Sequence, residues 1–147
     1  MSLYVILLSL HNIVRWAVLI LGVLALIQTL QGSGAGRTIT AGARRAVSSF
    51  MGSVHLQVLL GLLLFAYTGM QKIPAFADGR ASFKWEHVGL GLLVAVFATL
   101  ANGAARRGMT EAGSVRSAAI WTGLALLLSL LAMPWFRPLL RLRSEEH

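Results

Sequence analysis

The stretch LYVILLSLHNIVRWAVLILGVLALIQTL, residues 3–30, decides the fold of this chain. A helix rising about 1.5 Å per residue needs roughly 20 apolar residues to cross a hydrocarbon core about 30 Å thick, and this run exceeds that length. A single strand would leave its backbone polar groups unpaired in lipid. The run therefore predicts a transmembrane helix.

Three further apolar runs follow, at residues 47–70, 85–105 and 118–136, and each has about the length of one span. Four spans predict an all-α integral membrane four-helix bundle in up-down-up-down order, with the N and C termini on the same side. We expect residues 1–147 to form a single transmembrane domain. We name the face of the two termini side A, and the face of the first and third loops side B.

The composition agrees with a membrane location. The 147 residues are 56% hydrophobic and 12% charged, whereas about a quarter of a soluble domain is charged. The net charge of +8 comes mostly from arginines between the spans, so we expect it to meet anionic lipid headgroups and not nucleic acid. The loops 31–46 and 106–117 are compactly basic, which favours a cytoplasmic side B. The absence of cysteine excludes disulfides, iron–sulfur clusters and covalent haem attachment.

Polar side chains inside the spans are costly and are expected to face the bundle interior, where they become candidates for function. They are few: His11 and Arg15 in the first span, His55 and Gln57 in the second, Glu86, His87 and Asn102 in the third. Each histidine has a small residue near it on the same helical face, such as Gly91 beside His87 and Gly52 beside His55. Small residues allow close helix packing, and they also leave room for a flat macrocycle. Gln57 and Asn102 are expected to form interhelical hydrogen bonds or to contact a quinone.

The depths of the histidines predict which of them can act together. His11 and His87 should differ by about 5 Å along the membrane normal, whereas His55 should lie about 12 Å from His11 toward side B. His11 and His87 are therefore the expected axial ligands of one haem iron, with His55 or Met133 as an alternative ligand. The buried Arg15 needs an anion, which a haem propionate or Glu86 would supply.

Three short motifs carry a resemblance to a known family. LHNIVRW at residues 10–16, HLQVLLGLLLF at residues 55–65 and FKWEH at residues 83–87 are similar to the LHxxxRW, HxQxxxGxxxF and FxxEH patterns of small bacterial four-helix membrane proteins described as cytochrome b. The resemblance covers all four spans, but only these three motifs are distinctive. It implies a b-type haem, electron transfer in the bacterial inner membrane, and His11, His55 and His87 as the pool of haem ligands.

Three classes of function follow from these patterns. The first is a b-type cytochrome that passes single electrons between a quinol and a redox partner, through a haem that lies between two histidines. The second is a metal site for zinc, copper or iron built from His11, His55, His87 and Glu86. The third is a cofactor-free accessory subunit of a membrane complex. Other membrane redox subunits or a second copy of the chain are the expected partners, and the spans hold no hydrolase or transferase signature.

Overall fold

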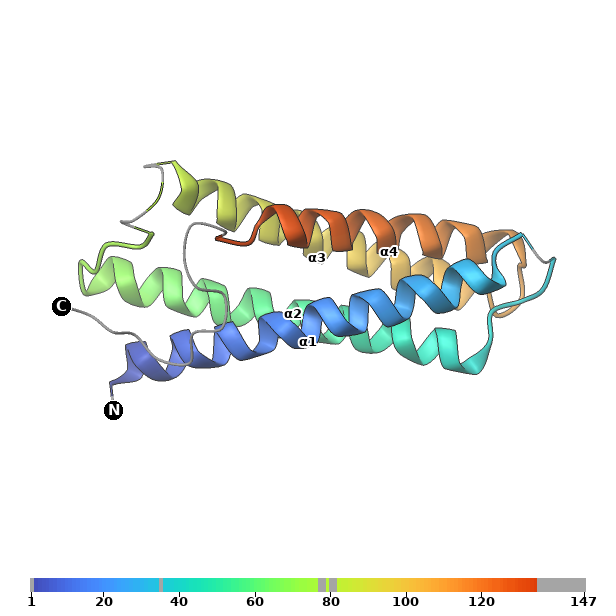
Figure 1. Cartoon of the computed structure of the whole chain (residues 1–147), viewed down its shortest axis with the longest axis horizontal. Coiled ribbons are helices and arrows are strands. Elements are labelled where there is room, and N and C mark those ends of the chain that lie inside the picture. The colour runs from blue at the N-terminus through green and yellow to red at the C-terminus, as the bar shows by residue number, and fades with distance from the viewer. Residues whose placement is uncertain (1, 35, 77–78, 80–81, 135–147) are drawn as a thin grey trace.

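The computed structural model describes residues 2–34, 36–76, 79 and 82–134. Within these residues the chain forms four helices and no strand: α1 (Leu3–Gly32), α2 (Ala41–Met70), α3 (Phe83–Arg107) and α4 (Gly113–Leu131). Figure 1 shows the helices side by side along one axis, each running opposite to the one before it. All four are long and apolar enough to cross a membrane, so the predicted all-α membrane bundle is confirmed.

The helix bounds differ most from prediction in α2 and α4. The second helix begins at Ala41, six residues earlier than predicted, because the Thr40 side chain caps its first turn by accepting a hydrogen bond from the Ala43 N–H. The fourth helix ends at Leu131, so the prediction that it continues to residue 136 is wrong for residues 132–134. Pro134 explains this end, because proline disfavours helical conformation in the residue before it. Residues 135 and 136 lie outside the described part of the chain.

The four helices pack as a closed ring. α1 packs against α2, α2 against α3, α3 against α4, and α4 against α1, so α1 and α3 face each other across the diagonal. The start of α1 and the end of α4 lie at the same end of the bundle, which is side A (Figure 1). This agrees with up-down-up-down order. The C terminus itself lies outside the described residues.

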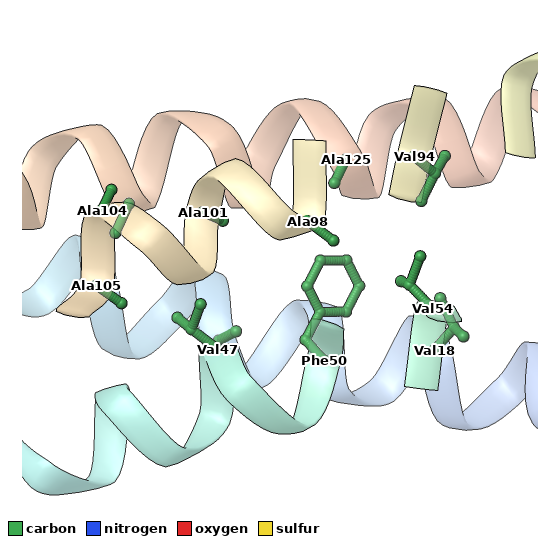
Figure 2. Packing of buried hydrophobic residues seen from close by; sticks show 12 residues of the cluster. Val18, Val47, Phe50, Val54, Val94, Ala98, Ala101, Ala104, Ala105 and Ala125 are labelled. Carbon is green, nitrogen blue, oxygen red and sulfur yellow. The ribbon is translucent and has the colours of Figure 1, made fainter. Parts of the chain in front are cut away.

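The half of the bundle toward side B is packed tightly by small residues. We call this region the alanine half; its buried residues include Val47 and Phe50 of α2, Ala98, Ala101, Ala104 and Ala105 of α3, and Ala118 and Ala125 of α4. Figure 2 shows the Phe50 ring of α2 pointing toward Ala98 of α3. A Cβ atom added at Gly22 of α1 would lie 2.9 Å from both Phe50 Cε1 and Leu126 Cδ1. Gly22 therefore lets α1 approach the Phe50 ring closely.

The two loops at side B are joined to each other. The Ile39 N–H donates to the Gly108 carbonyl at 2.8 Å, which connects the loop before α2 to the turn after α3. One turn into the bundle, Arg44 Nη1 donates to Asn102 Oδ1 at 2.9 Å. The predicted interhelical hydrogen bond of Asn102 is thus confirmed.

The outer surface of the bundle is apolar along all four helices. Large hydrophobic side chains such as Ile20, Leu59, Val96 and Leu127 are each more than half exposed. Apolar side chains in such numbers need a hydrocarbon solvent on the outside. The chain is therefore a multi-pass membrane protein.

Candidate functional site in the bundle near side A

A cavity opens among all four helices in the half of the bundle toward side A. We call this region the cavity half. The cavity has a volume of about 190 Å³, and most of its lining is apolar. Its lining includes the sequence-predicted residues His11, Arg15, Gln57, His87, Gly91 and Met133.

The side chains of His11 and His87 meet in this cavity. Their ring centroids are 6.1 Å apart, and the ring planes make an angle of 78°. His11 lies on α1 and His87 on α3, which are the two helices that face each other across the diagonal of the ring. The expected proximity of these two histidines is observed; their role as ligands stays a prediction.

His87 is held in place by its surroundings. Its Nδ1 lies 2.7 Å from the carbonyl oxygen of Ala132, just beyond the end of α4. Since a carbonyl can only accept, Nδ1 carries a proton and donates this hydrogen bond. The ring also packs against Phe76 and Phe83, with centroid distances of 4.9 and 5.7 Å. In metal sites, a ligating histidine is usually oriented in this way: the ring nitrogen that does not bind the metal donates a hydrogen bond to a carbonyl or carboxylate.

His11 faces a glycine on the neighbouring helix. A Cβ atom at Gly61 of α2 would lie 3.1 Å from His11 Cε1, so the imidazole would have to move by a few tenths of an ångström to accommodate it. Its Nδ1 is buried and has no hydrogen-bond partner among the described residues. A buried polar atom without a partner is costly unless something else in the site satisfies it.

The charge in the cavity is positive. Arg15 is 9% exposed, and its Nη2 donates to Asn12 Oδ1 at 2.6 Å. Lys84 also lines the cavity, and its Nζ lies 5.1 Å from the centroid of the Trp85 ring. Among the described residues no Asp or Glu lines the cavity. The lining therefore favours a group that is largely apolar and carries negative charge.

Glu86 lies at the start of α3, on the exposed surface. Its Oε2 accepts a hydrogen bond from Ser82 Oγ at 2.6 Å, and it is not part of the described cavity lining. The predicted pairing of Glu86 with Arg15 stays a prediction. Gly91 lines the cavity with nothing within 4 Å of its Cβ position, and Met133 is buried there with 5% exposure.

His55 lies away from the other two histidines, on the outer surface of α2. Its neighbours on that face, Gly52 and Leu59, are exposed as well, so the expectation that this face points into the bundle is wrong. The face of α2 that packs inside the bundle carries Val47, Phe50 and Val54. His55 is rotated away from this face about the helix axis by roughly the angle between two consecutive residues, so its side chain points outward. Sequence spacing gives the faces of a helix but not which face turns inward.

The described residues contain no group of three His, Cys, Asp or Glu side chains that could hold a metal ion. The predicted metal site of His11, His55, His87 and Glu86 is therefore not formed by this arrangement. Gln57, expected to form an interhelical hydrogen bond, instead has a buried Oε1 without a partner in the described structure.

Sequence reasoning missed three residues of the site. Asn12 was detectable, because it precedes Arg15 by three residues and so lies on the same helical face. Gly61 was visible as a glycine, but only the helix packing reveals that it faces His11. Phe76 reaches His87 from a loop in which its φ is +56°, a conformation that helix periodicity does not predict.

Comparisons with protein-family models, with curated proteins and with solved structures gave no match.

Proposed function

We propose that this protein is a membrane-embedded b-type cytochrome in which His11 and His87 are the axial ligands of one haem. The observation that carries the proposal is the pair of imidazoles from diagonal helices, 6.1 Å apart between ring centroids inside one cavity. Metal–imidazole bonds are about 2 Å long, and the ring centre lies about 1 Å beyond the ligating nitrogen. Two imidazoles on one iron therefore have centres about 6 Å apart.

The other residues of the cavity fit the same group. Arg15 and Lys84 offer cations to the two haem propionates, and the guanidinium of Arg15 can hold a carboxylate with two parallel hydrogen bonds. Gly61 leaves space for the His11 ring, and Gly91 leaves open volume near His87. The apolar lining would keep water from the site.

The chain's own residues would orient the ligands and adjust the site. The Ala132 carbonyl accepts from His87 Nδ1, which aligns the ring and makes Nε2 a stronger electron-pair donor. The positive charge of the buried Arg15 would stabilise the reduced state of the site relative to the oxidised state. A bound b-type haem would supply reversible one-electron chemistry. Together these features suit a carrier of single electrons between a lipid-soluble quinol and a redox partner.

The family resemblance supports the same proposal and adds a location. A small cytochrome b of this kind would reside in the bacterial inner membrane, with the arginine-rich loops of side B in the cytoplasm. Partner subunits or a second copy of the chain would exchange electrons with it.

The test is an absorption spectrum of protein produced with ample haem. We expect a sharp α-band and a shifted Soret band on reduction with dithionite. His11→Ala and His87→Ala should each abolish the low-spin spectrum, whereas His55→Ala should retain it. If the wild-type protein binds no haem under these conditions, the proposal is wrong, and the cofactor-free accessory subunit becomes the better description.

A further inference from the structure

A polar pair lies on the lipid-facing surface between α2 and α3. His55 of α2 and Thr99 of α3 are both exposed, and His55 Nε2 lies 2.9 Å from Thr99 Oγ1. His55 is near the middle of the 30-residue helix α2, so it lies far from the headgroups on both sides. A histidine at that depth on an outer surface is costly and is therefore a candidate for function.

The hydrogen bonds determine where the proton of His55 resides. Thr99 Oγ1 donates its single proton to the Ala95 carbonyl at 2.7 Å. The hydroxyl can then only accept from the imidazole, so Nε2 of His55 carries the proton. Nδ1 is left as a hydrogen-bond acceptor on a side chain that faces the hydrocarbon.

Lipid acyl chains cannot satisfy that acceptor, because they have no hydrogen-bond donor. A ligand for it must dissolve in the bilayer and carry a hydroxyl group. We propose that the His55–Thr99 pair is a binding site for a lipid-soluble hydroquinone, whose hydroxyl donates to His55 Nδ1. The role of this site in electron transfer rests on the proposed cytochrome function, but the binding itself does not.

The surroundings of the pair suit a flat ring with an apolar tail. Gly52 lies one turn before His55 on the same face of α2, is exposed, and has nothing within 4 Å of its Cβ position. An aromatic ring can therefore approach the backbone there. Exposed Leu59 on α2 and Val96 on α3 continue the apolar surface on which a tail would lie.

The site is also close to the cavity half. His55 and Gly61 are separated by six residues of α2, or about 9 Å along the helix axis. The Cβ position of Gly61 is in turn 3.1 Å from His11 Cε1. A hydroquinone at His55 would thus lie across one helix from the pair of histidines proposed to hold the haem.

The test measures binding of decyl-hydroquinone to the full chain in lipid nanodiscs, both with haem and without it. Its dimethyl ether, which has the same ring and tail but no hydroxyl donor, is the ligand control. We expect the hydroquinone to bind about tenfold more tightly than the ether, and His55→Ala to remove this difference. Thr99→Val should weaken hydroquinone binding severalfold, because His55 loses the partner that fixes its proton.

The matched control is Thr29→Val, since Thr29 Oγ1 donates to the Ala25 carbonyl at 2.8 Å in the same way but is buried. This variant should bind the hydroquinone like the wild type. Equal binding of hydroquinone and ether by the wild type, or unchanged binding by His55→Ala, would overturn the inference. A third result would also overturn it: His55→Ala changes the protein from dimer to monomer but still binds the hydroquinone. The His55–Thr99 pair would then be a contact between two copies of the chain.

Measuring hydroquinone binding to protein without haem distinguishes a failure of this inference from a failure of the proposed cytochrome function. Selective hydroquinone binding by a protein that never takes up haem would support the site and contradict the cytochrome. Haem binding without selectivity for the hydroxyl would do the reverse.

Discussion

The alanine half and the cavity half belong to the same four helices but are packed in opposite ways. In the alanine half, Ala98 and Ala101 of α3 are completely buried, and so is the Phe50 ring, which points toward Ala98 (Figure 2). In the cavity half, the same helices leave about 190 Å³ open around His11 and His87. One half thus fixes the distances between the helices, and the other leaves an open cavity between the same helices.

The membrane makes this division useful. Lipid provides no hydrophobic force between helices, so their association depends on close packing, and small residues provide the closest packing. If the alanine half supplies most of the stability, substitutions there should lower the free energy of unfolding without a direct effect on the site. Substitutions in the cavity half should do the opposite.

The largest effect is expected from Phe50→Ala. The ring is completely buried against small residues that cannot move in to replace it, so the variant should lose about 3–5 kcal/mol of unfolding free energy. Steric trapping or unfolding in SDS would measure this loss. Leu127→Ala on the outer face of α4, where Leu127 is 54% exposed, should change stability by less than about 0.5 kcal/mol. Similar losses in the two variants would contradict the assigned role of the alanine half.

The next largest effect on stability is expected from Gly22→Ala in the alanine half, compared with Gly91→Ala in the cavity half. Gly22→Ala places a Cβ atom 2.9 Å from Phe50 Cε1 and should destabilise the protein by about 1–3 kcal/mol. Gly91→Ala meets nothing within 4 Å and should leave stability unchanged or raise it by about 0.4–1 kcal/mol. The same unfolding measurement compares the two. Equal effects would mean that the halves do not differ in packing.

A smaller effect is expected from Gly61→Ala in the cavity half. Its Cβ would lie 3.1 Å from His11 Cε1, so the ring must move by a few tenths of an ångström. We expect haem affinity to fall about tenfold, which corresponds to about 1.4 kcal/mol, while unfolding of the haem-free protein changes little. Haem titration measures the affinity. Gly69→Ala on the same helix, with open space at its Cβ, should bind haem normally.

Some features of the fold and the site could be predicted from the sequence, whereas others depend on packing between helices. The four spans follow directly from hydropathy, because lipid leaves a long apolar segment few alternatives to a helix. The meeting of His11 and His87 followed from counting residues from side A, since helix rise is constant. The outward position of His55 did not follow, because the inward face of α2 depends on how Phe50 packs against Gly22 of another helix. The contacts of Phe76 were equally hidden, since they depend on the backbone of a loop.

The smallest effect is expected from Asn102→Ala, which removes the acceptor for Arg44 in the alanine half. Arg44 is only partly buried and is in the first turns of α2 near side B, so its guanidinium can turn toward water and headgroups once Asn102 is gone. The loss should therefore be about 1 kcal/mol, below the cost of leaving a charge buried without a partner. Arg44→Ala, alone and combined with Asn102→Ala, completes a double-mutant cycle that isolates the pair. Because the pair lies at the opposite end of the bundle from His11 and His87, the haem spectrum should not change. A spectral change would show that the two halves are coupled along the helices and do not act separately.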